Sequence, residues 1–506
     1  MATLEHDLQD QGFSLRETHI SRVFLGPERV FKLKKPVQLG FLDFSTLERR
    51  RRYCHAELEL NRRLAPDVYL DVVPVTRDAR GVHHLRGDGE IVDYAVEMLR
   101  LSDSAAADAR LREGTLGHAE LERIAVRLAA FHAAARCDAE TEQYGSLDCI
   151  ERNVRENFEQ TREAAPRALQ RSELAAIERW QLAFLRERRA VFERRIAQRR
   201  IRDGHGDLRL EHCYLGPRGE VQIIDCIEFN ERFRYGDVCA DMAFLAMDLS
   251  WHERRDLSEA LIAYYARESG DYELYALLDF YQSYRAYVRG KVSSILEASA
   301  GSESVRQRAN AQARKYYLLA EACTREALER PRLFAVGGSI ASGKSTLAAR
   351  LGRSSCAPVI ASDRLRKQLA GVAPLEPLRD AAFSGNYTPE QSERVYAELL
   401  RLAEVVLASG RSVVLDASFR ESSARGKLRE LAARRGVALR CVECWAPDDV
   451  IRARLVERAK AASVSDGRSE VLEAFNARYE PTEADWLRVD TSRGIGEETL
   501  NELSRA

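Results

Sequence analysis

Long apolar runs and a net charge of either sign are both missing from this chain. None of its 506 residues belongs to an apolar run near the ~18–20 residues that a membrane-spanning helix needs. Lys and Arg total 78 against 79 Asp and Glu, so the net charge of −1 attracts neither nucleic acid nor an anionic membrane. The first residues, MATLEHDLQD, contain no apolar core of a signal peptide. We therefore expect a cytoplasmic protein with neither membrane nor nucleic acid as a partner.

Clustered cysteines are also scarce. The ten cysteines are scattered, with one exception at Cys441-Val-Glu-Cys444. Zinc needs four ligands, and no second CxxC or HxH accompanies this pair. Because the surrounding run VALRCVECWAP is typical of a β-strand, we interpret the two cysteines as residues of a strand and not as a metal or redox pair.

The pattern of expected elements divides the chain near residue 329. Residues 1–96 contain strand-like runs and one helical stretch, and residues 100–328 are mostly helical. From 329 to 506, strand-like and helical runs alternate, as in a parallel sheet with crossover helices. We predict an α+β domain over 1–328, with lobes over about 1–96 and 100–328, and an α/β domain over 329–506.

A phosphate-binding loop is the clearest motif in the second domain. The run Gly338-Ser-Ile-Ala-Ser-Gly343-Lys344-Ser345 fits G-x-x-x-x-G-K-[ST] and lies between the strand-like RLFAV and the helix-like TLAARL. The glycines let backbone N–H groups turn toward a phosphate, and the helix N-terminus adds a favourable dipole. Lys344 is predicted to reach the β- and γ-phosphates, and Ser345 to ligate Mg²⁺. The expected nucleotide-binding set is Gly338, Ser339, Ile340, Ala341, Ser342, Gly343, Lys344, Ser345 and Thr346.

Two carboxylates follow strand-like runs of the same domain. Asp416 ends VVLD and is followed by Ala417 and Ser418, so no adjacent Glu polarises a water, which favours transfer to a hydroxyl over hydrolysis. We take Asp416 as a candidate Mg²⁺ ligand. Asp363 follows APVIAS, at the strand end where ligands bind in open parallel sheets, so we predict a general base there. The alternative for Asp363 is a helix N-cap.

Three arginines lie in the run VIRARLVERAK. Arg454 and Arg458 are four residues apart and share a face of the expected helix, where they are candidates to neutralise charge during phosphoryl transfer. A solvated helix face is the alternative. With the phosphate loop, and with Asp363 followed by Arg366 and Lys367, residues 331–506 resemble the small P-loop kinases, especially the zeta-toxin-like and gluconate/shikimate-kinase-like groups.

The first domain carries a second catalytic pattern. His205-Gly206-Asp207 is predicted to form a tight Gly-supported loop, and an expected hairpin brings Asp225, at the end of the run Ile223-Ile224-Asp225, close to it. Phosphoryl transfer needs one carboxylate that accepts the hydroxyl proton and another that holds the metal. We predict these roles for Asp207 and Asp225, with His205 bracing the loop by hydrogen bonds. A polar turn next to a strand-end Asp is the alternative.

Upstream residues suggest where a nucleotide would bind in this domain. Lys32 lies in the second strand of an expected hairpin and Glu57 on the next helix, a pair that orients ATP phosphates in kinase folds. Lys34 points to the same face and is the alternative. Glu97 and Leu99 are predicted to lie at a hinge that presents backbone groups to adenine.

Further along, Asp241 is a candidate brace beneath the catalytic loop. Arg285 and Arg289 share a helix face and are candidates either for pairing with Asp237 or Asp241 or for contacting a substrate.

Together these residues resemble the aminoglycoside-phosphotransferase family, a branch of the protein-kinase-like fold, over about 20–300. The whole chain resembles the bacterial subgroup in which such a domain is fused to a P-loop kinase. The resemblance implies Asp207 as base, Asp225 as metal ligand, and Lys32 with Glu57 at the phosphates.

Two positions depart from that family. Its metal-binding Asn is His212 here, which leaves His212 as a candidate ligand. The hairpin before Lys32 has only Gly26 in place of a Gly-rich loop.

The expected activity is therefore ATP- and Mg²⁺-dependent transfer of a phosphoryl group to a hydroxyl of a small molecule, such as a sugar or nucleotide sugar. The second domain carries the stronger motif. One alternative is that the first domain is a non-catalytic regulatory module, and another is that it silences a toxin-like kinase.

Overall fold

The computed structural model describes residues 3–505 apart from 41, 379, 381–382 and 461–462. Contacts divide the chain into two compact units, which we call unit 1 (residues 1–254 and 281–321) and unit 2 (residues 255–280 and 322–506). Packing units need not coincide with folding domains, and the boundary at 328–329 stays a prediction. The two units are described separately below.

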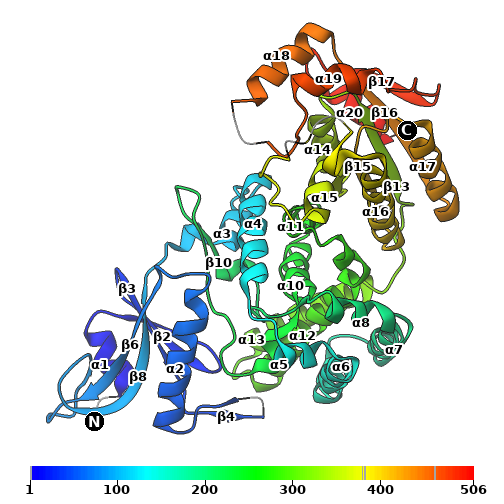
Figure 1. Ribbon diagram of the computed structural model, residues 1–506. Helices are drawn as coiled ribbons and strands as arrows, with labels where there is room; N and C mark the ends of the chain where they lie inside the picture. Colours follow the sequence, from blue (N-terminus) through cyan, green and yellow to red (C-terminus); the bar gives the residue numbers. More distant parts are fainter. Residues whose placement is uncertain (1–2, 41, 379, 381–382, 461–462, 506) are drawn as a thin grey trace. The chain divides into compact units, whose positions relative to one another are not determined.

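Unit 1 begins with an antiparallel sheet of six strands in the order β1-β2-β3-β8-β6-β7 (Figure 1). The expected hairpin around Gly26 is formed by β2 and β3, and the expected helix is α2. Buried residues of α2 pack on one face of the sheet, and Leu8 of α1 joins the core on the other. The elements are α1 (Leu4–Asp10), β1 (Ser14–Glu17), β2 (Ser21–Leu25), β3 (Arg29–Lys34), β4 (Gln38–Leu39), β5 (Leu42–Asp43), α2 (Leu47–Arg62), β6 (Tyr69–Arg77), β7 (His83–Leu85) and β8 (Glu90–Leu99).

The rest of unit 1 is mainly helical. Two short antiparallel pairs, β12–β9 and β10–β11, interrupt the helices and carry the loops around Asp207 and Asp225. A sheet lobe followed by a helical lobe is the protein-kinase-like α+β fold predicted for this part. The elements are α3 (Ala107–Arg112), α4 (His118–Ala134), α5 (Ala139–Glu142), α6 (Leu147–Thr161), α7 (Arg171–Glu187), α8 (Arg189–Ala197), β9 (Ile201–Asp203), β10 (Cys213–Leu215), β11 (Val221–Ile223), α9 (Glu231–Arg234), β12 (Tyr235–Asp237), α10 (Val238–Trp251), α12 (Leu278–Ser299) and α13 (Glu303–Ala322).

Unit 2 is built on a five-stranded sheet in the order β14-β15-β13-β16-β17, and every pair in it is parallel. The strands alternate with helices, which confirms the predicted α/β class. The core joins Phe334 and Val336 of β13 to Leu347 and Leu351 of α14. The elements are β13 (Arg332–Gly338), α14 (Lys344–Ser354), β14 (Val359–Ala361), α15 (Ser362–Leu369), α16 (Pro389–Ala408), β15 (Val413–Asp416), α17 (Ser422–Arg435), β16 (Ala438–Trp445), α18 (Asp448–Arg458), α19 (Ser469–Asn476), β17 (Trp486–Asp490) and α20 (Glu497–Arg505).

One segment of unit 2 comes from the middle of the chain. Residues 255–280 contain α11 (Arg255–Ser269) and a short 3-10 helix (Tyr272–Ala276). The Tyr272 hydroxyl donates to the carbonyl of Val359 at 2.7 Å, at the start of β14. Arg411, just before β15, pairs with Glu259 at 2.8 Å and with Asp279 at 2.7 Å. Polar side chains thus tie this segment to two strands of the parallel sheet.

The buried CxxC run lies on the predicted strand. Cys441 and Cys444 are both buried in β16, and both are free thiols. Their side chains belong to the strand's packing, as the sequence indicated.

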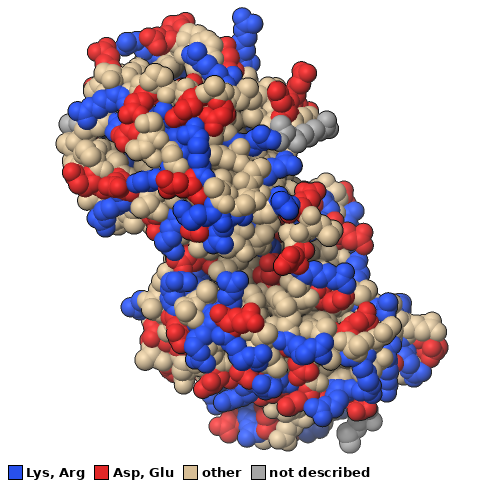
Figure 2. Space-filling view, turned by 90° about the vertical axis from the view of Figure 1, so that its right-hand side faces the viewer, with Lys and Arg blue, Asp and Glu red and all other residues tan. Residues whose placement is uncertain are grey.

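Surface charge is mixed, as the composition predicted. Figure 2 shows Lys and Arg interspersed with Asp and Glu over the face in view. Among the described residues, no helix combines the length and the apolar composition that crossing a bilayer requires.

Candidate functional site

The predicted phosphate loop joins β13 to α14 in unit 2. Gly338, Ala341 and Gly343 all have positive φ angles, of 131°, 58° and 91°. A Cβ atom at Gly338 would lie 2.3 Å from the carbonyl oxygen of Cys444, so only glycine fits there. The helix begins at Lys344, and its first amides have no partner within the helix. The loop therefore has the geometry of an anion-binding turn at a helix N-terminus.

A cavity of about 720 Å³ lies beside this loop within unit 2. Its wall includes side chains from α11, α15 and the end of β15 as well as the loop. Of the predicted site residues, those that line it are Ile340, Ala341, Gly343, Lys344, Ser345, Thr346, Asp363, Asp416 and Arg458. Four other predicted residues of this unit do not line the cavity: Gly338, Ser339, Ser342 and Arg454.

Asp416 lies next to the amine and the hydroxyl of the phosphate loop. Burial raises the pKa of Asp416 to about 6, although Lys344 and a hydrogen bond with the Ser345 side chain act in the opposite direction. Burial likewise lowers the pKa of Lys344, while Asp416 and Asp363 oppose that effect. The Lys344 Nζ donates to the Ser339 carbonyl at 2.6 Å. A hydroxyl and a carboxylate side by side are hard oxygen donors of the kind that Mg²⁺ prefers, so Ser345 and Asp416 fit that ion.

Asp363 is the second residue of α15. The helix N-cap is Ala361, so the alternative in which Asp363 serves as N-cap is wrong. Asp363 lines the cavity and lies close enough to Lys344 and Asp416 to affect both pKa values. The structure therefore brings the candidate base to the phosphate loop.

The two lid arginines occupy different places. Arg458 lines the cavity. Arg454 donates to the Ala341 carbonyl at 3.2 Å and to the Thr491 carbonyl at 2.6 Å. Arg454 therefore joins the residue that follows β17 to the phosphate loop and does not line the cavity. Arg458 does line it, although both arginines belong to α18. Only Arg458 is placed to contact a bound phosphate chain from the cavity side.

Sequence reasoning assigned no role to the arginines and aromatic rings that also line the cavity. Arg366 is 9% exposed, and its guanidinium lies 4.6 Å from the centre of the Tyr387 ring. Its Nε has no hydrogen-bond partner within the described part of the chain. Arg420 lies 4.6 Å from the Phe383 ring centre. The motif D-x-x-R after β14 was the available signal for Arg366; no local pattern marks the aromatic rings.

In unit 1, two lysines share one buried glutamate. Glu57 is 1% exposed, and its two carboxylate oxygens lie 2.8 Å from Lys32 Nζ and 2.8 Å from Lys34 Nζ. Lys32 also contacts Asp225 Oδ1 at 2.5 Å, and Lys34 contacts Glu228. The Lys32–Glu57 pair expected from the sequence is present, and Lys34 joins it instead of replacing it.

The loop around Asp207 is held from below. Asp241 accepts hydrogen bonds from the backbone N–H groups of His205 at 2.7 Å and Gly206 at 2.9 Å, as predicted for a brace. Burial lowers the pKa of His205 to about 4, so its ring is neutral near pH 7. The ring lies 3.0 Å from the Ile224 carbonyl through Nε2 and receives the Asp207 N–H at Nδ1, 3.3 Å away. These bonds fix the backbone that carries Asp207.

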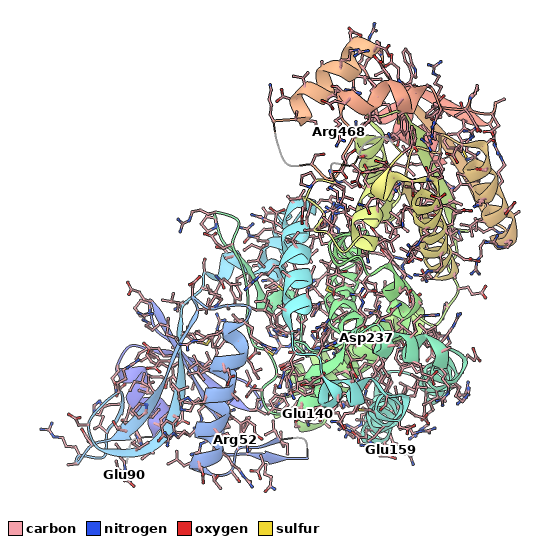
Figure 3. All side chains as sticks on the ribbon, in the orientation of Figure 1. Arg52, Glu90, Glu140, Glu159, Asp237 and Arg468 are labelled. Atoms are coloured by element: carbon pink, nitrogen blue, oxygen red, sulfur yellow. The ribbon has the colours of Figure 1, made fainter. Side chains whose placement is uncertain are left out.

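Asp237 does not depend on Arg285 or Arg289 for a partner. It is labelled in Figure 3 at the start of α10, and buried Arg195 donates to its two oxygens at 2.8 and 2.6 Å. Arg285 instead donates to the Ala240 carbonyl at 3.3 Å.

Asp207, His212 and Asp225 form a compact donor cluster. One ligand atom from each lies within 4.8 Å of the other two. Burial opposes ionisation of Asp225, but Lys32 and His212 outweigh it and hold its pKa well below the usual range. This donor set, two carboxylates and one imidazole, fits a divalent metal ion.

Asp225 also has a strained backbone, with φ of 66°. Its N–H donates to the Tyr69 hydroxyl at 3.2 Å, and the next N–H, of Cys226, donates to Asn61 Oδ1 at 2.8 Å. Tyr69 and Asn61 come from β6 and α2, so the sheet lobe holds this turn. Their roles carry no sequence signal.

Glu97 and Leu99 lie at the end of β8. The Leu99 N–H donates to the Val68 carbonyl at 2.8 Å, and the Glu97 side chain pairs with Arg86. Contact with adenine from this strand end stays a prediction.

Fold and loop geometry together define a P-loop domain with a phosphate-binding turn in unit 2, joined in one chain to a domain of protein-kinase-like fold. The AAA domain family matches residues 333–482, which span β13 to the residues before β17.

Over nearly its whole length the chain is 35% identical to the uncharacterized protein Rv2004c of Mycobacterium tuberculosis, across 502 residues that cover 97% of this chain and 96% of that one. The chain belongs to the same family as that protein.

Solved structures resemble the two parts separately. A gluconokinase from Sinorhizobium meliloti is 24% identical, over 36% of this chain and 90% of that chain, with a TM-score of 0.25. The GDP complex of aminoglycoside 2'-phosphotransferase-IIIa is 12% identical, over 60% of this chain and 91% of that chain, with a TM-score of 0.35.

Proposed function

We propose that the chain transfers the γ-phosphoryl group of ATP to a hydroxyl of a small molecule of the sugar or nucleotide-sugar class, and that unit 2 carries this reaction. One observation supports the proposal above all others: a single cavity is lined by the phosphate loop, by Asp363 and by Asp416. A nucleotide held by the loop would thus place its terminal phosphate beside a carboxylate on the acceptor side.

Asp363 accepts the hydroxyl proton as the acceptor oxygen bonds to the γ-phosphorus. The bond between that phosphorus and the β,γ-bridging oxygen breaks, and ADP leaves with the electron pair. Lys344 and Arg458 hold positive charge beside the transferring group. Mg²⁺, when bound, neutralises charge on the phosphate oxygens, and Ser345 and Asp416 are the residues that would hold it.

The arginines that line the cavity support an acceptor with a negative charge. Arg366 has a buried guanidinium whose Nε is unsatisfied, and Arg420 lies near the same cavity beside aromatic rings. A buried guanidinium favours a carboxylate or phosphate that binds two of its N–H groups. A nucleotide sugar carries such phosphates and a base that can lie against Phe383 or Tyr387.

The test is a screen of the full chain with radiolabelled ATP and Mg²⁺ over sugars, nucleotide sugars and aminoglycosides. Lys344→Ala should lower transfer by at least about 10³-fold, because it removes charge stabilisation of the transferring group. Asp363→Asn should lower kcat with little change in ATP affinity. Lys460→Ala, at an exposed lysine that pairs with Glu457, is the matched control and should be silent. Full activity of Lys344→Ala would refute the assignment to unit 2.

As an alternative, we propose that unit 1 is a non-catalytic, ligand-binding module that regulates unit 2; the hairpin before Lys32 favours it. The turn of the β2–β3 hairpin contains a single glycine, Gly26, and a Cβ there would lie 2.8 Å from the Phe13 ring. This turn lacks the repeated glycines that let a backbone approach phosphates. Asp207→Asn separates the two possibilities, since unchanged transfer by this variant would show that unit 1 is no catalyst.

A further inference from the structure

We infer that unit 1 binds Mn²⁺ in preference to Mg²⁺, through the two carboxylates of Asp207 and Asp225 and the imidazole of His212. This inference rests on the proposed metal-binding role of Asp225 and His212, and it goes further by naming the ion that the donor set selects. It concerns binding and holds whether unit 1 is a catalyst or a regulatory module.

The orientation of His212 is the first observation. Its Nδ1 lies 2.8 Å from the backbone carbonyl oxygen of Asp207. A carbonyl oxygen only accepts, so Nδ1 carries the hydrogen. Nε2 therefore faces the carboxylates, 3.5 Å from Asp225 Oδ2 and 3.6 Å from Glu211 Oε1. Metal-binding histidines have this arrangement, in which one ring nitrogen donates to a carbonyl and fixes the direction of the other.

The charges around Nε2 are the second observation. In a neutral ring, the Nε2 lone pair would point at carboxylate oxygens that also carry lone pairs. Such a contact is favourable only when a cation, either a proton or a metal ion, lies between the atoms. Arg209 contacts Glu211 Oε1, and Lys32 contacts the other oxygen of Asp225, Oδ1, at 2.5 Å. Oδ2 thus stays available on the His212 side.

The choice of ion follows from the donor types. Mg²⁺ favours oxygen ligands in near-octahedral geometry and keeps several waters. Mn²⁺ shares the preference of Mg²⁺ for carboxylate and water oxygens but, as a first-row transition ion, gains more from a nitrogen ligand than Mg²⁺ does. One nitrogen with two carboxylates therefore favours Mn²⁺ over Mg²⁺. An amide in place of the imidazole would supply an oxygen ligand and remove that preference.

The test measures metal binding to the full chain without nucleotide or acceptor. Ser345→Ala is present in every sample, so that the phosphate loop contributes no metal ligand from that hydroxyl. Free Mn²⁺ is followed by its electron paramagnetic resonance signal, and Mg²⁺ is then titrated as a competitor. We expect one Mn²⁺ per chain, bound at least about tenfold more tightly than Mg²⁺.

His212→Asn should reduce the ratio of Mn²⁺ to Mg²⁺ affinity by at least about tenfold, mainly through weaker Mn²⁺ binding. Asp225→Asn should weaken binding of both ions. His55→Asn, at an exposed histidine of α2, is the matched control and should leave the ratio unchanged. His212→Gln serves as a second variant if the Asn form melts at a lower temperature in metal-free buffer.

Absence of Mn²⁺ binding in the parent chain would overturn the inference. An unchanged affinity ratio in both His212 variants would overturn it as well. Because no phosphoryl transfer is measured, an inactive unit 2 leaves these outcomes unaffected.

Discussion

The two candidate phosphate sites are built from different groups. In unit 2 the candidate site is made of main chain, in a turn with positive φ at Gly338 and Gly343 that leads into the N-terminus of α14. In unit 1 the candidate groups are side chains, Lys32 and Lys34 around buried Glu57. Main-chain donors carry no net charge and need no counter-ion. Buried ammonium groups need carboxylates nearby, which is why each lysine has two acidic contacts.

This difference changes which substitutions do harm. A site made of backbone is sensitive to any added Cβ and tolerant of changes in distant charges. A site made of buried ion pairs is sensitive to loss of one partner, because the other is then left charged and unpaired. Unit 2 also contains such pairs, and one of them joins Arg411 to Glu259 and Asp279 beneath its sheet. Four predictions examine this contrast, in order of decreasing effect.

The largest effect is expected at Arg411, which joins residues 255–280 to the start of β15 and is not part of the phosphate loop. Arg411→Ala leaves Glu259 and Asp279 without their shared guanidinium, and we expect a loss of about 3–5 kcal/mol in unfolding free energy. Denaturant unfolding measures it. The control is Arg401→Ala, because Arg401 is 43% exposed and its pairs with Glu273 and Glu398 should contribute about 0–1 kcal/mol. Equal losses in both variants would contradict the prediction.

Next comes Gly338 in the phosphate loop. Gly338→Ala forces a Cβ to within 2.3 Å of a backbone carbonyl at a φ of 131°. Strain of this kind costs about 1–3 kcal/mol, so ATP affinity of unit 2 should fall by up to about 100-fold. Fluorescent ATP titration measures it. Gly26→Ala in the unit 1 hairpin places a Cβ 2.8 Å from the Phe13 ring, which can move, and 3.2 Å from the Arg29 carbonyl oxygen, and it should change the ATP affinity of unit 2 by less than about threefold.

Glu57 should show a smaller effect that is confined to unit 1. Glu57→Gln removes the charge shared by the two lysines, while Asp225 and Glu228 remain beside them. We expect about tenfold weaker ATP binding to unit 1, measured in a Lys344→Ala background that silences unit 2, since a hydrogen bond to a charged group contributes about 1.5–3 kcal/mol. If Glu57→Gln, introduced without Lys344→Ala, also weakened ATP binding by unit 2, the two sites would not be independent.

The smallest effect distinguishes two tyrosines of the same 3-10 helix. Tyr272→Phe loses the hydrogen bond to the Val359 carbonyl on β14 and should cost about 1 kcal/mol. Backbone amides of residues 359–369 should exchange hydrogen faster. These residues form β14 and α15, the helix that contains Asp363. Tyr275 is equally buried, but its hydroxyl has no hydrogen-bond partner in the described residues, so Tyr275→Phe should be neutral or slightly stabilising. Similar exchange in both variants would contradict a role for the Tyr272 hydroxyl.

Local patterns predicted the elements well where one segment contains the whole signal. The β2–β3 hairpin, helix α2 and the strand that holds Cys441 and Cys444 all lie where the sequence indicated. The loop before α14 was likewise predicted, since strand, turn and helix are contiguous there. The N-cap alternative for Asp363 was wrong by two positions, an ordinary error because helix ends have weak sequence signals.

Contacts between distant segments were harder to predict. Sequence periodicity put Arg454 and Arg458 on one helix face, yet Thr491 of a later segment draws Arg454 away from the cavity side. The packing of residues 255–280 in unit 2 could not be predicted from local hydrophobic periodicity, because that periodicity shows which helix face is buried but not which element covers it. Lys34 was an alternative to Lys32, and only the position of Glu57 shows that both contact it.

The amino-acid sequence alone determined the two fold classes, the phosphate loop and the separate residues of the Asp207 loop, because backbone conformation and apolar periodicity are properties of short segments. The tertiary structure alone decided which charges meet: two lysines on one glutamate, His212 directed at Asp225, and a segment from the middle of the chain beside the helix of Asp363. Coulomb energies and desolvation depend on distance and burial in space, and neither quantity can be read from separation along the chain.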